Sequence, residues 1–147
     1  MKLTSRRILE IRLGISEISK VNKEHGFPIY DLGFKVNLHL AKASNALRPA
    51  HQEIEKKTDE FRIKLAEVNK GKITPKKDAT QEEIAEAIKV NTEIGVSAKM
   101  LDDQYQSYLD TETHDVQITP ISWDEMASAK CASPSPEVLS WLSPLFS

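Results

Sequence analysis

Apolar residues recur every three or four positions through most of this chain, and this spacing constrains the fold more than any other feature. Side chains three and four residues apart share one face of an α-helix, so the pattern predicts helices that each carry an apolar stripe. The first stripe consists of Ile8, Ile11, Ile15 and Ile18. It predicts a helix over about residues 5–24, with Thr4 as the N-cap and Gly26 and Pro28 as the stop signal.

Two longer stripes follow and predict helices over residues 31–69 and 80–110. Pro49 lies inside the first of them, and a kink is expected there because proline lacks an N–H group. A loop of about ten residues joins the two helices, which favours a long antiparallel hairpin packed as in a coiled coil. Asn91 falls within the second stripe, and either fixes the register of the helices or lies at the edge of the seam.

The period changes over residues 113–118, where Val116 and Ile118 alternate with polar residues and predict a short strand. A single strand is unstable, so Val116 and Ile118 need a pairing partner. Within the chain, Ile29 and Tyr30 are the nearby candidates, but the preceding proline makes them a poor edge. The alternative is a strand from a second copy or from another protein.

The C-terminal residues divide into a short predicted helix over 123–130 and a proline-containing linker with an apolar tail over 131–147. The chain is thus expected to be mainly α, with a helical domain over residues 1–130 that includes one short strand, followed by the tail. The large apolar residues of the tail are Val138, Leu139, Trp141, Leu142, Leu145 and Phe146. They either dock onto the helices as a short helical segment or form a binding site for another protein.

The formal net charge of −2 conceals a strong asymmetry. Residues 1–77 carry a net charge of +8, and residues 78–147 carry −10. Either one half binds a polyanion or the two halves lie against each other. The predicted hairpin favours the second explanation, because it places the arm over residues 50–69 and its lysine-rich turn beside the acidic helix over 80–110. The candidates for phosphate contacts lie in the loop of the hairpin and are Lys70, Lys72, Lys76 and Lys77. No aromatic residue among them could stack on a base, which disfavours nucleic acid as the partner.

The sequence contains no pattern typical of an enzyme, a cofactor site or a metal site. Its histidines, at positions 25, 39, 51 and 114, lie in unrelated contexts, and the one cysteine, Cys131, has no histidine nearby. Gly71 and Lys72 lack the other residues of a phosphate-binding loop. We therefore expect no catalytic, cofactor-binding or metal-binding residues.

No apolar run approaches the ~20 residues of a membrane span, and no continuous apolar stretch follows Arg6 and Arg7 as in a secretion signal. We therefore expect a cytoplasmic protein that is not integral to a membrane.

Several segments resemble small, mostly helical proteins encoded by tailed bacteriophages. They are the helix from Ile8 to Ile18, Phe27-Pro28, residues 40–47, Glu60-Phe61-Arg62 and residues 112–121. The resemblance covers about residues 1–126 and carries over no catalytic residue. It implies a viral protein located in the host cytoplasm or in the virion.

The expected function is therefore that of a non-enzymatic helical protein that binds proteins, as an assembly or virion component of a phage. Its partner would be a second copy, another viral subunit or a host protein. One alternative is a phage-encoded inhibitor of a host or defence protein. Another is a nucleic-acid-binding protein that uses the basic loop of the hairpin.

Overall fold

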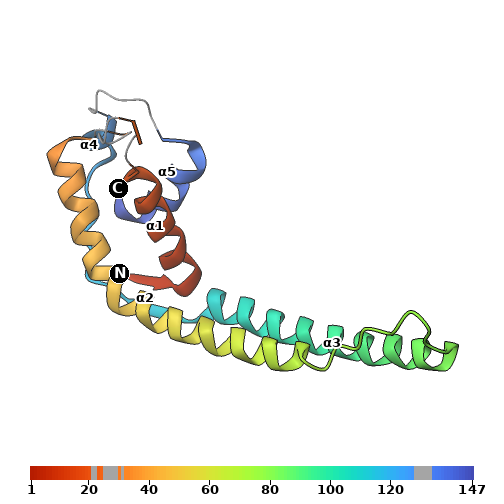
Figure 1. Ribbon diagram of the computed structural model, residues 1–147. Coiled ribbons are helices and arrows are strands. Elements are labelled where there is room, and N and C mark those ends of the chain that lie inside the picture. Colours follow the sequence, from red (N-terminus) through yellow and green to blue (C-terminus); the bar gives the residue numbers. More distant parts are fainter. Residues whose placement is uncertain (21–22, 25–29, 31, 128–133) are drawn as a thin grey trace. The chain divides into compact units, whose positions relative to one another are not determined.

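The computed structural model describes residues 1–20, 23–24, 30, 32–127 and 134–147 (Figure 1). It is mainly helical, as predicted. The elements are β1 (Lys2–Thr4), α1 (Ser5–Ile18), α2 (Gly33–Asn69), α3 (Gln81–Thr111), β2 (Thr113–Asp115), α4 (Trp123–Ala127), α5 (Pro136–Leu142) and a 3₁₀ turn, η1 (Ser143–Leu145). They form two compact units: unit 1 comprises Met1–Gln52 and Thr111–Ser147, and unit 2 comprises Glu53–Asp110.

Helix α1 begins as the sequence predicts, because the Thr4 hydroxyl oxygen accepts a hydrogen bond of 3.2 Å from the backbone N–H of Arg7. The helix ends at Ile18, earlier than predicted, and Ser19 and Lys20 beyond it are exposed. The predicted stop signal at Gly26 and Pro28 lies outside the described residues.

Strand β2 is shorter than predicted, and its partner is β1, a strand that the sequence pattern does not predict. The strands are antiparallel, with Leu3 opposite His114. The backbone pairing extends to Val116, whose N–H donates to the carbonyl oxygen of Met1 at 2.8 Å. Val116 is buried, and Ile118 lies beyond the strand and is half-buried. The expectation that this strand pairs with a second copy or another protein is therefore wrong: the chain supplies its own partner.

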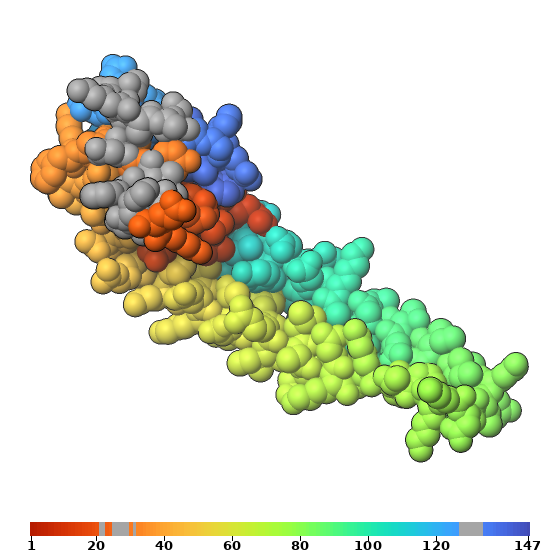
Figure 2. Space-filling model, turned by 45° about the horizontal axis from the view of Figure 1, so that its top comes forward, coloured from red at the N-terminus to blue at the C-terminus, as the bar shows by residue number. Residues whose placement is uncertain are grey.

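The C-terminal tail lies against α1 in unit 1, and Figure 2 shows the blue C-terminal residues beside the red and orange surface of α1. Ser135 caps α5 by accepting a hydrogen bond of 3.3 Å from the N–H of Val138, and Pro136 occupies the first turn, where its missing N–H costs no hydrogen bond. The contact with α1 is closest at Gly14, where an added Cβ would lie 2.9 Å from Leu142 Cγ. A glycine is therefore needed at this point for the two helices to approach.

The core of unit 1 combines the stripe of α1 with the first part of α2 and with the C-terminal residues. Its most deeply buried side chains are Ile8, Ile11, Val36, Leu47, Leu142 and Leu145. Pro49 lies inside α2, whose helical conformation continues from Gly33 to Asn69. The kink expected at Pro49 stays a prediction.

Unit 2 is the predicted antiparallel hairpin, formed by the part of α2 from Glu53 onwards and by α3 (Figure 1). The start of α3 is a capping box: the Thr80 N–H donates to Glu83 Oε2, and the Glu83 N–H donates to Thr80 Oγ1, both at 3.2 Å. Asn91 holds the loop, because its side-chain amide accepts from the N–H of Ile73 and donates to the carbonyl of Ile73, both at 2.8 Å. Of the two interpretations of Asn91, this contact favours the edge of the seam, where it is half-buried.

The close approach at Gly14 leads to a first prediction. Replacing Gly14 with valine should lower the free energy of unfolding by ~1–3 kcal/mol, because the new side chain would displace the buried Leu142. Urea unfolding followed by circular dichroism measures this change. Ser16→Val is the matched control, since Ser16 is exposed on the same helix, and should change the free energy by about 0.5 kcal/mol or less. Equal losses in both variants would contradict the packing role of Gly14.

Candidate interaction surfaces

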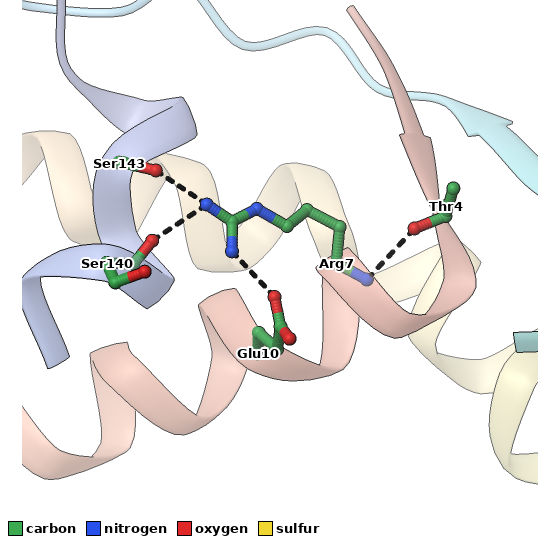
Figure 3. Close-up of polar contacts among 5 residues, drawn as sticks. All are labelled: Thr4, Arg7, Glu10, Ser140 and Ser143. Carbon is green, nitrogen blue, oxygen red and sulfur yellow. Dashed lines mark hydrogen bonds and ion pairs between the residues drawn. The ribbon is translucent and has the colours of Figure 1, made fainter. Parts of the chain in front are cut away.

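Arg7 ties the C-terminal helix to α1 (Figure 3). Its Nη2 donates to the carbonyl oxygen of Ser140 at 2.7 Å and to Ser143 Oγ at 2.5 Å. Its Nη1 donates to Glu10 Oε2 at 2.6 Å, which orients the guanidinium toward α5. The positive charge also lies at the C-terminal end of α5, where a helix favours cations. The tail is therefore held by charge-assisted hydrogen bonds as well as by apolar packing.

The sequence left two possibilities for the apolar residues of the tail: they dock onto the helices of the same chain, or they form a binding site for another protein. Leu142, Leu145 and Phe146 are buried inside unit 1, so they belong to the core and do not form a surface for a partner. The Phe146 ring stacks on Trp123 at 4.7 Å between centroids, and His39 Nε2 donates to the carbonyl oxygen of Leu145 at 2.8 Å. The outer residues Val138, Leu139 and Trp141 are half-buried. Partner binding at these three stays a prediction.

The four candidate phosphate-binding lysines, Lys70, Lys72, Lys76 and Lys77, lie together in the loop of unit 2 and are all exposed. Lys70 forms an ion pair of 2.8 Å with Glu67, three residues before it. The structure thus brings the basic residues to one end of the hairpin, as the sequence predicted.

The seam between the helices of unit 2 is only partly covered. Phe61 of α2 lies against Tyr105 and Tyr108 of α3, with ring centroids 5.2 and 6.4 Å apart, and all three rings are half-buried. Thr58 Oγ1 is hydrogen-bonded to Tyr105 Oη at 2.9 Å, which explains why a polar residue occupies this position of the seam. Beside these rings the surface is hollowed.

We refer to this hollow as the hairpin groove. It has a volume of about 390 Å³ and is lined by Thr58, Phe61, Arg62, Leu65, Leu101, Asp102 and Tyr105. Its walls are mostly apolar, and Arg62 and Asp102 place one charge of each sign at its rim. Phe61 and Leu65 lie in the predicted helix over 31–69, and Leu101 and Tyr105 lie in the one over 80–110. The sequence did not predict a groove, because periodicity does not show how completely an apolar stripe is covered.

Large apolar side chains are also exposed elsewhere on unit 2. Those that are more than half exposed are Ile63, Ile88, Val96 and Met100. Val96 and Met100 are four residues apart on α3 and so share a surface. On unit 1, Phe34 and Leu38 have the same spacing on α2, and Phe34 is 83% exposed.

The histidine, cysteine and acidic side chains offer no candidate metal site in the part of the chain that the structure describes. No three of them form a group that could hold a metal ion. His114 Nε2 is hydrogen-bonded to Ser5 Oγ at 2.9 Å, which links β2 to the start of α1. His25 and Cys131 lie outside the described part of the chain.

Among the described helices, none is long and apolar enough to cross a bilayer.

Comparison of this chain with models of protein families, with curated proteins and with solved structures finds no match.

The Arg7 contacts lead to a second prediction. Replacing Arg7 with methionine should lower the free energy of unfolding by ~1–3 kcal/mol, because hydrogen bonds to a charged group are lost while the apolar stem is kept. Hydrogen exchange in residues 136–146 should become faster than in the unaltered protein. Arg12→Met is the control on the same helix, because no described residue forms a hydrogen bond or ion pair with Arg12. Unchanged exchange in α5 of the Arg7 variant would contradict the proposed tie.

Proposed function

We propose that this chain is a non-enzymatic helical protein that acts by binding other proteins, as an assembly or virion component of a bacteriophage. The observation that carries the proposal is the exposure of large apolar side chains on unit 2, chiefly Ile63, Ile88, Val96 and Met100. The bacteriophage part rests on the resemblance of residues 1–126 to small helical phage proteins.

Exposed apolar side chains support a binding role, because the removal of apolar surface from water is the main favourable contribution to protein association. Each Å² of apolar surface removed from water contributes roughly 25 cal/mol. Single exposed apolar residues are common on proteins, but unit 2 combines several of them with a half-covered aromatic seam. A surface of this kind suits a protein partner better than a small polar ligand.

Copurification tests the proposal. A tagged full-length chain, produced in cells that carry the native phage, should recover a viral subunit in a fixed ratio. The variant V96S/M100S should recover at least ~10-fold less of it, because two apolar contacts are removed. The control K89S/E93S removes two exposed polar side chains from the same helix and should recover the wild-type amount. Recovery of a host or defence protein would favour the inhibitor, and recovery of no protein would contradict a binding role.

A second candidate function, nucleic-acid binding, is supported by the four exposed lysines in the loop of unit 2. It predicts binding that weakens with salt, with a slope of log K against log[salt] of up to about −3.6 if all four contact phosphates of duplex DNA. We expect no such binding in electrophoretic shift assays, because the adjacent helix α3 is acidic. A salt-dependent shift that disappears when Lys70, Lys72, Lys76 and Lys77 are replaced with glutamine would make this function the better one.

A further inference from the structure

The loop of unit 2 contains a stretch of backbone that the rest of the chain does not hold. Residues 70–78 are all exposed. Within the part of the chain that the structure describes, Thr74, Pro75, Lys77 and Asp78 form no hydrogen bond. Exposed loops of this kind are the preferred sites of proteolytic cleavage, because an endopeptidase binds its substrate as an extended segment and a helix must first unfold to provide one.

The same stretch carries the residue type that one class of endopeptidase requires. Lys76 and Lys77 are adjacent, and a protease with a carboxylate in its specificity pocket cleaves after a basic residue. One backbone hydrogen bond crosses this pair, from the N–H of Ala79 to the carbonyl oxygen of Lys76 at 3.1 Å, and it closes a single turn. The nearby bond after Lys72 is held more firmly, because the Asn91 side chain forms two hydrogen bonds with the backbone of the next residue.

A cut in this loop would leave an N-terminal and a C-terminal piece that share the core of unit 1. The N-terminal piece contributes Met1–Gln52 to that unit, and the C-terminal piece contributes Thr111–Ser147. Strand β1 of one piece pairs with β2 of the other, and Arg7 of the first donates to the carbonyl oxygen of Ser140 of the second at 2.7 Å. The core of unit 1 therefore joins the two pieces without the loop.

The seam of unit 2 also joins the two pieces, but more weakly. Thr58 Oγ1 of the N-terminal piece is hydrogen-bonded to Tyr105 Oη of the C-terminal piece at 2.9 Å. The residues from 53 to 110, which are all described, bury three side chains, those of Ile54, Ala87 and Leu109. Because buried apolar area provides most of the stabilisation, unit 1 contributes more to the association of the pieces than unit 2 does.

From these observations we propose that the pair Lys76–Lys77 is a processing site for an endopeptidase that cleaves after lysine, and that the cut chain persists as a folded complex held by unit 1. Hydrolysis adds one water molecule across the peptide bond. The C–N bond breaks, the lysine carbonyl becomes a carboxylate, and the amide nitrogen that follows becomes a terminal ammonium group. This site is separate from the exposed apolar side chains that carry the proposed function, so either proposal can fail without the other.

Limited digestion of the full chain with trypsin, followed by mass spectrometry of the intact products, tests the position of the site. The sequence contains one other pair of adjacent lysines, Lys56 and Lys57, which lies inside α2. The first cut should follow Lys76 or Lys77, at least ~10-fold faster than any cut in the helical pair, because α2 must unfold locally to be cleaved. K76Q/K77Q should remove these products, and the matched control K56Q/K57Q should form them at the unaltered rate. A first cut at any other position overturns the site.

Size-exclusion chromatography with light scattering tests the complex, once the trypsin has been inhibited. Cut and uncut samples should have the same mass, and circular dichroism should show the same helix content. In the cut chain, Arg7→Met should raise the dissociation constant of the two pieces at least ~5-fold, because its hydrogen bonds now join separate molecules. The control Arg12→Met, on the same helix, should leave this constant unchanged.

Two further outcomes decide the proposal. Wild-type pieces that separate after cleavage, or an Arg7 variant whose pieces bind as tightly as those of the Arg12 variant, overturn a complex held by unit 1. Mass spectrometry of the chain isolated from its native source should detect a piece that ends at Lys76 or Lys77. Detection of the uncut chain alone in that source overturns the processing.

Discussion

The close contact between Gly14 and Leu142 is the interaction on which the rest of unit 1 depends. Without a side chain at Gly14, α5 lies directly on α1, and Leu142 becomes fully buried. This position brings the end of α5 within reach of Arg7 and places η1 so that the carbonyl of Leu145 meets His39 on α2. The last residues then pair with Ile121, whose N–H donates to Leu145 and whose carbonyl accepts from Ser147. One missing side chain thus allows the two ends of the chain to share a core.

Whether the sequence predicts a part of this arrangement depends on how far apart along the chain the interacting residues lie. The helices and the Thr4 cap follow from residues a few positions apart, and both are confirmed. The strand Lys2–Thr4 is too short to show alternation, and its partner lies more than 100 residues away. The tie from Arg7 spans a similar separation. Local patterns show that the apolar side chains of the tail must be buried, but they do not show which surface buries them.

The hairpin groove of unit 2 is a second feature that local sequence patterns do not predict. A stripe such as that of α3 predicts one packed face, yet in a two-helix hairpin each stripe is covered from one side only. Charge complementarity between the paired helices stays a prediction. The ion pairs Lys57–Glu60, Arg62–Asp59 and Lys70–Glu67 each join residues three positions apart. Exposed pairs of this kind contribute only ~0–1 kcal/mol each, so they add little to the stability of the hairpin.

The two units differ in how complete their cores are, and this difference favours an intermolecular role for the hairpin. Unit 1 buries side chains from α1, α2, the strand region and the tail, whereas in residues 53–110, all of which the structure describes, the buried ones are Ile54, Ala87 and Leu109. So small a buried set provides little hydrophobic stabilisation against the conformational entropy of ordering two long helices. In the proposed function, the hairpin would gain its missing core by binding a protein, and its stability would then depend on the concentration of that partner. The apolar surface that the two helices leave exposed would be the surface that binds.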